Sequence, residues 1–88
     1  MTKVVNIYKN KYDIYIGRPN YFGNPFVIGI DGTRKTVIKL YKEWFYKEIK
    51  INSIFKTKIL ELKGKILGCY CSPKECHGDI ITEYLNNL

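Results

Sequence analysis

Residues 65–79 have the sequence KILGCYCSPKECHGD, and this stretch decides the fold. Lys65 to Cys71 is apolar enough to predict a central strand. Pro73 predicts a tight turn after that strand, and apolar residues at helical spacing from about Gly78-Asp79 onwards predict a final helix. A strand end, a loop and a helix N-terminus are therefore expected to converge here, which is typical of an α/β protein.

The rest of the chain predicts strands first and helices second. The β-branched and aromatic runs near the N-terminus favour strands, and the apolar period then changes to that of helices. We expect one domain, residues 1–88, of the α/β class: a mixed sheet of three to four strands with about three helices packed on it. In order, the predicted elements are strands at 3–8 and 12–17, an optional strand at 26–30, helices from Thr33 and after Asn52-Ser53, a strand at 65–71 and the final helix.

Composition indicates a folded protein in a reducing compartment. The chain is 45% hydrophobic and has 13 aromatic residues, which argues against disorder. It has no apolar run of the roughly 18 residues that a membrane span needs, and no basic-then-apolar leader. Three cysteines fit poorly with a secreted disulfide framework. We therefore expect a cytoplasmic location, in the host cytoplasm if the protein is viral, and no membrane partner.

A net charge of +7 favours anionic partners, either a small molecule or nucleic acid. The 13 lysines are scattered, so the charge is explained equally by solubility. The two arginines, Arg18 and Arg34, stand out because each lies beside a glycine-containing turn. A guanidinium offers a planar fork of donors that lysine cannot copy, so both are candidate ligand-binding residues.

All cysteines and the only histidine lie between positions 69 and 77. One interpretation is a zinc site made by Cys69, Cys71, Cys76 and His77, because Cys3His is an established structural ligand set. The spacing counts against it, since adjacent residues such as Cys76 and His77 can rarely both turn towards one ion. We therefore expect no cofactor, with zinc as the alternative.

A second interpretation is a catalytic or ligand-gripping site. A thiol at a helix N-terminus has a lowered pKa, which makes Cys76 a candidate nucleophile. His77 could act as acid or base, and Asp79 could orient it or cap the helix. The same N-terminus could accept a phosphate.

Two further interpretations of the cluster stay open. Cys71 and Cys76 could form a disulfide in an oxidising setting, or the cysteines could be ordinary buried residues with His77 capping the turn. The Gly-Arg-Pro and Gly-Asn-Pro turns could supply an opposite wall, with Arg18 and Asn24 as donors. Tyr21 lies in that loop and could stack on a base or plug the edge of the core.

These pieces resemble the small family called domain of unknown function 4326, which is found in phages and bacteria. The resemblance spans nearly the whole chain in the family's order, and its long Cys-x-Cys-x-Pro-x-x-Cys-His-Gly-Asp run is specific. It implies that the two Gly/Pro turns and the Cys/His run belong to one site, without assigning roles. The matching pieces are Val5-Asn6, Ile16-Gly17-Arg18-Pro19, Gly23-Asn24-Pro25-Phe26, Gly32-Thr33-Arg34, Tyr41-Lys42-Glu43-Trp44, and Leu67 to Pro73 running into Cys76-His77-Gly78-Asp79.

The function we expect from the sequence is binding, and conceivably processing, of a nucleotide-like or phosphate-bearing ligand in a pocket formed by these loops. Whether the chain is an enzyme is left open. Two alternatives come from other classes: a non-catalytic basic nucleic-acid-binding module, with or without a stabilising zinc ion, and a phage accessory protein that sequesters a host ligand or protein.

Overall fold

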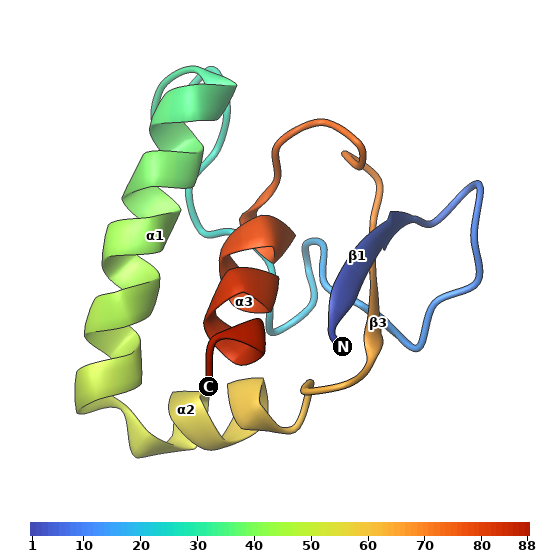
Figure 1. Cartoon of the computed structure of the whole chain (residues 1–88). Coiled ribbons are helices and arrows are strands. Elements are labelled where there is room, and N and C mark those ends of the chain that lie inside the picture. The colour runs from blue at the N-terminus through green and yellow to red at the C-terminus, as the bar shows by residue number, and fades with distance from the viewer.

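The computed structural model describes all residues, 1–88, as three strands and three helices (Figure 1). Their order confirms the predicted succession of strands, helices, strand and helix, and the α/β class. The elements are β1 (Lys3–Asn6), β2 (Ile14–Tyr15), α1 (Arg34–Ile51), α2 (Ser53–Leu60), β3 (Ile66–Cys69) and α3 (His77–Asn86).

The three strands form one sheet in the order β1-β3-β2, and both pairings are parallel. Lys3 pairs with Ile66 and Asn6 with Cys69, while Ile14 pairs with Leu67 on the other side. The sheet is therefore parallel where a mixed sheet was expected. The reason is that β1 and β2 do not form a hairpin: β3 lies between them, and the chain returns to the start of the sheet before β2 begins.

That return segment, residues 7–13, covers one face of β3, and the helices lie on the other side of the strands (Figure 1). A Cβ placed on Gly68 would lie 2.7 Å from ring atoms of Tyr12 and 2.8 Å from Ile7 Cγ2. Such distances are too short for a real side chain. Gly68 is therefore the residue that lets the return segment pass directly over the central strand.

α1 and α2 each begin directly after a residue whose side chain caps the helix. Thr33 precedes α1, and its side-chain oxygen accepts a hydrogen bond from the Thr36 backbone N–H at 3.3 Å. Asn52 ends α1 and caps α2, accepting from the Phe55 N–H at 3.0 Å. Both predicted starts are confirmed, because an oxygen at the N-cap satisfies an otherwise free N–H of the first turn.

The core fills the space between the sheet and the helices. Leu67 from β3 and Ile81 from α3 are fully buried, as are Phe45 from α1 and Ile59 from α2. Phe45 packs edge-to-face on Phe55 with ring centroids 5.7 Å apart. Apolar burial of this kind is the main stabilising contribution in a chain of this size.

Several predicted boundaries differ from the structure: of the strands expected at 3–8 and 12–17, β1 covers only Lys3–Asn6 and β2 only Ile14–Tyr15. β3 ends at Cys69 instead of continuing to Cys71, and α3 begins at His77. Residues 26–30 form no strand and make only an isolated bridge between Ile28 and Gly32. In that loop the Asp31 carboxylate accepts the Val27 N–H at 2.8 Å, so a side chain takes the place of a strand partner.

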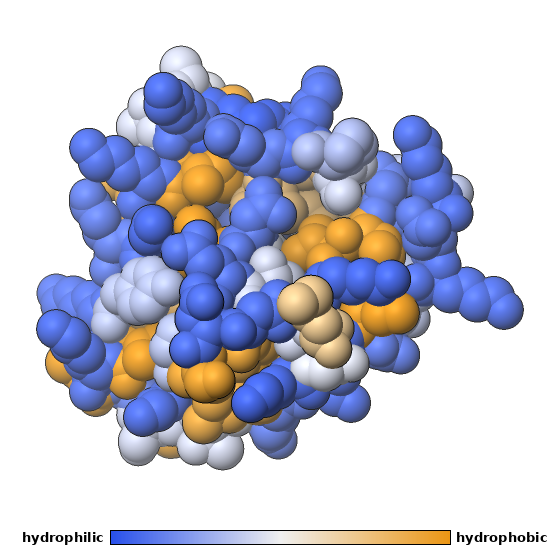
Figure 2. Space-filling view, in the orientation of Figure 1, coloured by the Kyte–Doolittle hydropathy of each residue, from blue (hydrophilic) through white to orange (hydrophobic).

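Figure 2 shows hydrophilic side chains spread over most of one face of the molecule, with smaller apolar areas between them. None of the three helices combines the length and the apolar character that crossing a membrane requires.

We predict that Gly68→Ala lowers the free energy of unfolding by about 1–3 kcal/mol, because the added methyl group overlaps Tyr12 and Ile7. Urea unfolding followed by circular dichroism measures this change. Tyr12→Ala in the same background should recover part of the loss, since Tyr12 supplies the nearest atoms. A Gly68→Ala protein as stable as the wild type would show that the return segment does not press on β3.

Candidate functional site

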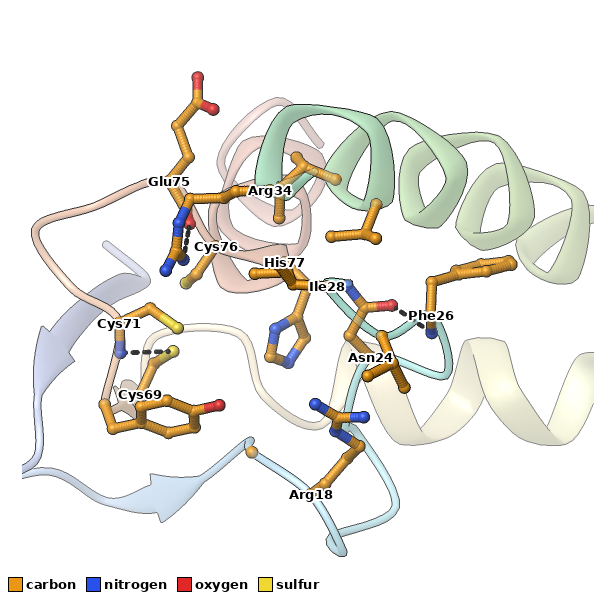
Figure 3. A pocket seen from close by; sticks show the side chains of 15 residues that line it. Arg18, Asn24, Phe26, Ile28, Arg34, Cys69, Cys71, Glu75, Cys76 and His77 are labelled. Carbon is orange, nitrogen blue, oxygen red and sulfur yellow. Dashed lines mark hydrogen bonds between the residues drawn. The ribbon is translucent and has the colours of Figure 1, made fainter. Parts of the chain in front are cut away.

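A cavity of about 230 Å³ lies where the last residues of β3, the loop after β2 and the start of α3 converge. Cys69, Cys76 and His77 line it together with Arg18, Asn24 and Arg34 (Figure 3). The structure thus brings the two Gly/Pro turns and the Cys/His run to one place. The catalytic and binding roles of these residues stay predictions.

His77 is the first residue of α3 and is buried, with 6% of its surface exposed. Its Nε2 lies 2.8 Å from the carbonyl oxygen of Ile16. A carbonyl can only accept, so Nε2 carries the proton and Nδ1 is left with a free lone pair. Burial lowers the pKa of His77 below its usual value, which keeps the ring neutral near pH 7.

Cys69 and Cys76 are both buried and their thiols interact. The Cys76 thiol donates to the Cys69 sulfur, which lowers the pKa of Cys69 to about 6, and the Cys71 N–H also donates to this sulfur at 3.4 Å. The same hydrogen bond, donated by the Cys76 thiol to Cys69, raises the pKa of Cys76, and the burial of Cys76 raises it further. Cys69, which ends the strand, is therefore the thiolate of the pair, whereas the sequence favoured Cys76.

One ligand atom from each of Cys69, Cys76 and His77 lies within 4.8 Å of the others. Adjacent residues were expected to turn inward together only rarely, and Cys76 and His77 do so here. Cys76 is the extended N-cap, with φ −146° and ψ 165°, while His77 already has helical backbone, and this change of conformation brings both side chains to one side. These three residues could hold a metal ion.

Cys71 is half-buried, and its side chain hydrogen-bonds the Cys69 sulfur, but its own sulfur is not one of the donor atoms that all lie within 4.8 Å of one another. All three cysteines are free thiols in the structure, so the Cys71–Cys76 disulfide is not present.

The two arginines approach the cavity from different segments (Figure 3). Arg34, at the start of α1, donates to the Glu75 carbonyl oxygen at 3.0 Å, which fixes its guanidinium. The Arg18 guanidinium has no hydrogen-bond or ion-pair partner in the protein, whose single ion pair joins two other residues. A Cβ on Gly23 would lie 2.8 Å from Arg18 Cγ, so the two Gly/Pro turns pack directly together.

Asn24 also lies at the cavity, and its side-chain oxygen is already used. That oxygen accepts the Phe26 N–H at 2.9 Å, which stabilises the Gly-Asn-Pro turn and leaves the amide N–H groups as donors.

Two of the predicted residues are not brought to the cavity. Tyr21 is half-exposed, packs edge-to-face on Phe22 and has the Lys58 ammonium 5.3 Å from its ring centre. Asp79 accepts the Cys76 backbone N–H at 3.2 Å and so caps α3. The capping alternative for Asp79 fits the structure, because its carboxylate is committed to that bond.

Sequence reasoning missed Asn6, the last residue of β1. Its side-chain amide donates to the Ser72 carbonyl at 2.7 Å and to the Tyr70 carbonyl at 3.3 Å, so it anchors the loop that follows β3. Its oxygen accepts the Tyr8 N–H at 2.8 Å. The position of Asn6 is the signal that could have identified it. Asn6 is a lone amide side chain at the end of a β-branched strand, and the strand beside it is buried and ends in cysteine.

These features define a small parallel α/β domain with a cavity, lined by polar and apolar residues, at the carboxyl ends of its strands. The chain belongs to the family described as domain of unknown function (DUF4326), which matches residues 2–87. It is similar to an "uncharacterized 12.4 kDa protein in nrdA-td intergenic region" of Enterobacteria phage T4. The two are 43% identical over 89 aligned positions, which cover 100% of this chain and 81% of the phage protein. No solved structure matches significantly.

We predict that the protein loses stability when the pH falls below about 6.5, the ordinary pKa of histidine. Because the pKa of His77 is lower in the folded state, the unfolded chain takes up the proton first, and stability falls by up to about 1.4 kcal/mol per pH unit. Urea unfolding between pH 7.5 and pH 5 in a Cys69→Ser background, with a chelator present, measures this effect without the contribution of the Cys69 thiolate. His77→Gln should flatten this part of the profile, and an unchanged slope in that variant would contradict the assignment.

Proposed function

We propose that this chain binds a nucleotide-like or phosphate-bearing ligand in the cavity between Arg18 and Arg34. The observation that carries the proposal is that two arginines, from separate segments, line one partly apolar cavity. Arginine is the side chain best suited to phosphate oxygens, because its donors form a planar fork.

The charges at the cavity support an anion. Arg18 has no protein partner to compete with a ligand, and Arg34 is already held in place by the Glu75 carbonyl. Glu75 is the single acidic residue among those that line the cavity, and its carboxylate points away from the centre in Figure 3. His77 adds no positive charge near pH 7 and the Cys69 thiolate adds a negative one, so Arg18 and Arg34 are the positive groups available to an anion at the cavity.

The apolar wall supports a ligand that is more than a bare ion. Phe26, Ile28 and Val37 are among its nine hydrophobic residues. A volume of about 230 Å³ lies below the ~300–1,000 Å³ of most small-molecule sites. It suits a phosphate with the sugar or part of a base, while the remainder of the ligand stays in solvent.

Two side chains that could react with a ligand line the same cavity. The Cys69 thiolate and the neutral His77 ring both line the cavity, so a ligand held by the arginines would lie next to a nucleophile and a base. The binding proposal does not depend on any reaction there.

We predict that Arg18→Ala weakens binding of adenosine 5′-monophosphate by about ten- to a hundredfold, because one charge-assisted contact is lost. Isothermal titration calorimetry gives the dissociation constants. Because the Arg18 guanidinium makes no hydrogen bond or ion pair within the protein, the fold should be unchanged, which circular dichroism checks.

Lys56→Ala is the matched control, since it removes the same charge from α2, away from the cavity. It should leave the affinity unchanged. Equal weakening by both substitutions would indicate attraction by net charge alone and would overturn the proposal, as would equal affinity of Arg18→Ala and the wild type.

A further inference from the structure

We infer that Cys69, Cys76 and His77 form a three-ligand zinc site with a fourth position open to the cavity. This goes beyond the proposed function and does not rest on it, because the three donor atoms are placed by the fold irrespective of any phosphate-bearing ligand.

The first support is the chemistry and spacing of the donors. Two thiols and one imidazole are a known zinc ligand set, and sites with three protein ligands keep a fourth position for water. Bonds of about 2.3 Å to sulfur and 2.0 Å to nitrogen in a tetrahedron need donors about 3.5–3.8 Å apart. The observed limit of 4.8 Å means that the donors would move together by about 1 Å.

The second support is the orientation of His77. Its Nε2–H donates to the Ile16 carbonyl, so Nδ1 is the nitrogen available to a metal. Figure 3 shows the imidazole ring facing the cysteine sulfurs. A metal-bound histidine almost always gives its other N–H to a carbonyl or carboxylate, which fixes the tautomer and the direction of the ring. Here that partner is already in place and buried.

The third support concerns the sulfurs. Cys69 is 1% exposed and Cys76 is 2% exposed, so both donors are shielded from bulk water. The Cys71 backbone N–H lies 3.4 Å from the Cys69 sulfur and would stabilise a bound thiolate. Cys76 is fixed by its place at the N-cap of α3, where Asp79 holds its backbone.

The fourth position is open because Cys71 stands outside the group of converging donors. Cys69, Cys76 and His77 all line the cavity, so a water in the fourth position would face it. A zinc ion in such a site acts as a Lewis acid and supplies hydroxide near neutral pH.

Cobalt substitution tests the site directly. Purified protein, reduced with a phosphine, is freed of metal with a chelator and titrated with Co²⁺ alone. One equivalent should give intense tetrahedral visible bands and a sulfur-to-cobalt charge-transfer band in the near ultraviolet, and Zn²⁺ should then displace the cobalt. Absence of both features from folded protein would overturn the inference.

Single substitutions identify the donors. Cys69→Ser should reduce the charge-transfer intensity to about half, since one of two thiolates is lost. Cys71→Ser is the control and should leave the intensity unchanged. If Cys71→Ser lost about one third of the charge-transfer intensity, a third thiolate would be bound to the metal. That result would overturn the inference that the fourth position is open.

His77 needs a variant that keeps the core filled. His77→Gln should shift the visible bands and weaken Co²⁺ binding at least tenfold, with the fold checked by circular dichroism. Should His77→Gln fail to fold, the wild-type protein enriched in ¹⁵N-histidine decides: Zn²⁺ should shift the Nδ1 resonance and leave Nε2 protonated. An unshifted Nδ1 resonance would overturn the role of His77.

Discussion

The hydrogen bond between His77 Nε2 and the Ile16 carbonyl is the contact on which the cavity depends. It ties the first residue of α3 to the residue before Gly17-Arg18, so it holds two cavity walls at a fixed distance. The helix can come this close because Gly78 has no side chain. A Cβ at this position would lie 2.7 Å from side-chain atoms of both Val4 and Ile16. Such a buried bond is costly to lose, since it would leave two polar groups unsatisfied.

Much of the fold follows from local sequence signals. The apolar period predicted α1 with its start at Thr33, a second helix was expected after Asn52-Ser53, and the order of elements was confirmed. Strand direction was not predictable, because it is set by pairing between distant residues. The return segment fits only where Gly68 lacks a side chain, and no local pattern reveals that contact. Residues 26–30 were overpredicted because the Asp31 side chain satisfies the backbone instead of a neighbouring strand.

The candidate site, like the fold, was predicted only in part from the sequence. Residue chemistry and strand-loop-helix logic indicated that Arg18, Asn24, Arg34 and the Cys/His run would lie together, and the structure places them around one cavity. The adjacency rule failed for Cys76 and His77, because the backbone changes from extended to helical between them. Asn6 was missed since its importance comes from contacts with the loop after β3, more than sixty residues away.

The proposed function requires that an anion enters this cavity and lies between Arg18 and Arg34. A crystal structure of the wild-type protein grown with tungstate tests this requirement, because tungstate is a tetrahedral phosphate analogue whose anomalous signal locates it without ambiguity. We expect a tungstate peak in the cavity, within hydrogen-bonding distance of both guanidinium groups. Peaks confined to exposed lysines, with the cavity empty, would contradict it.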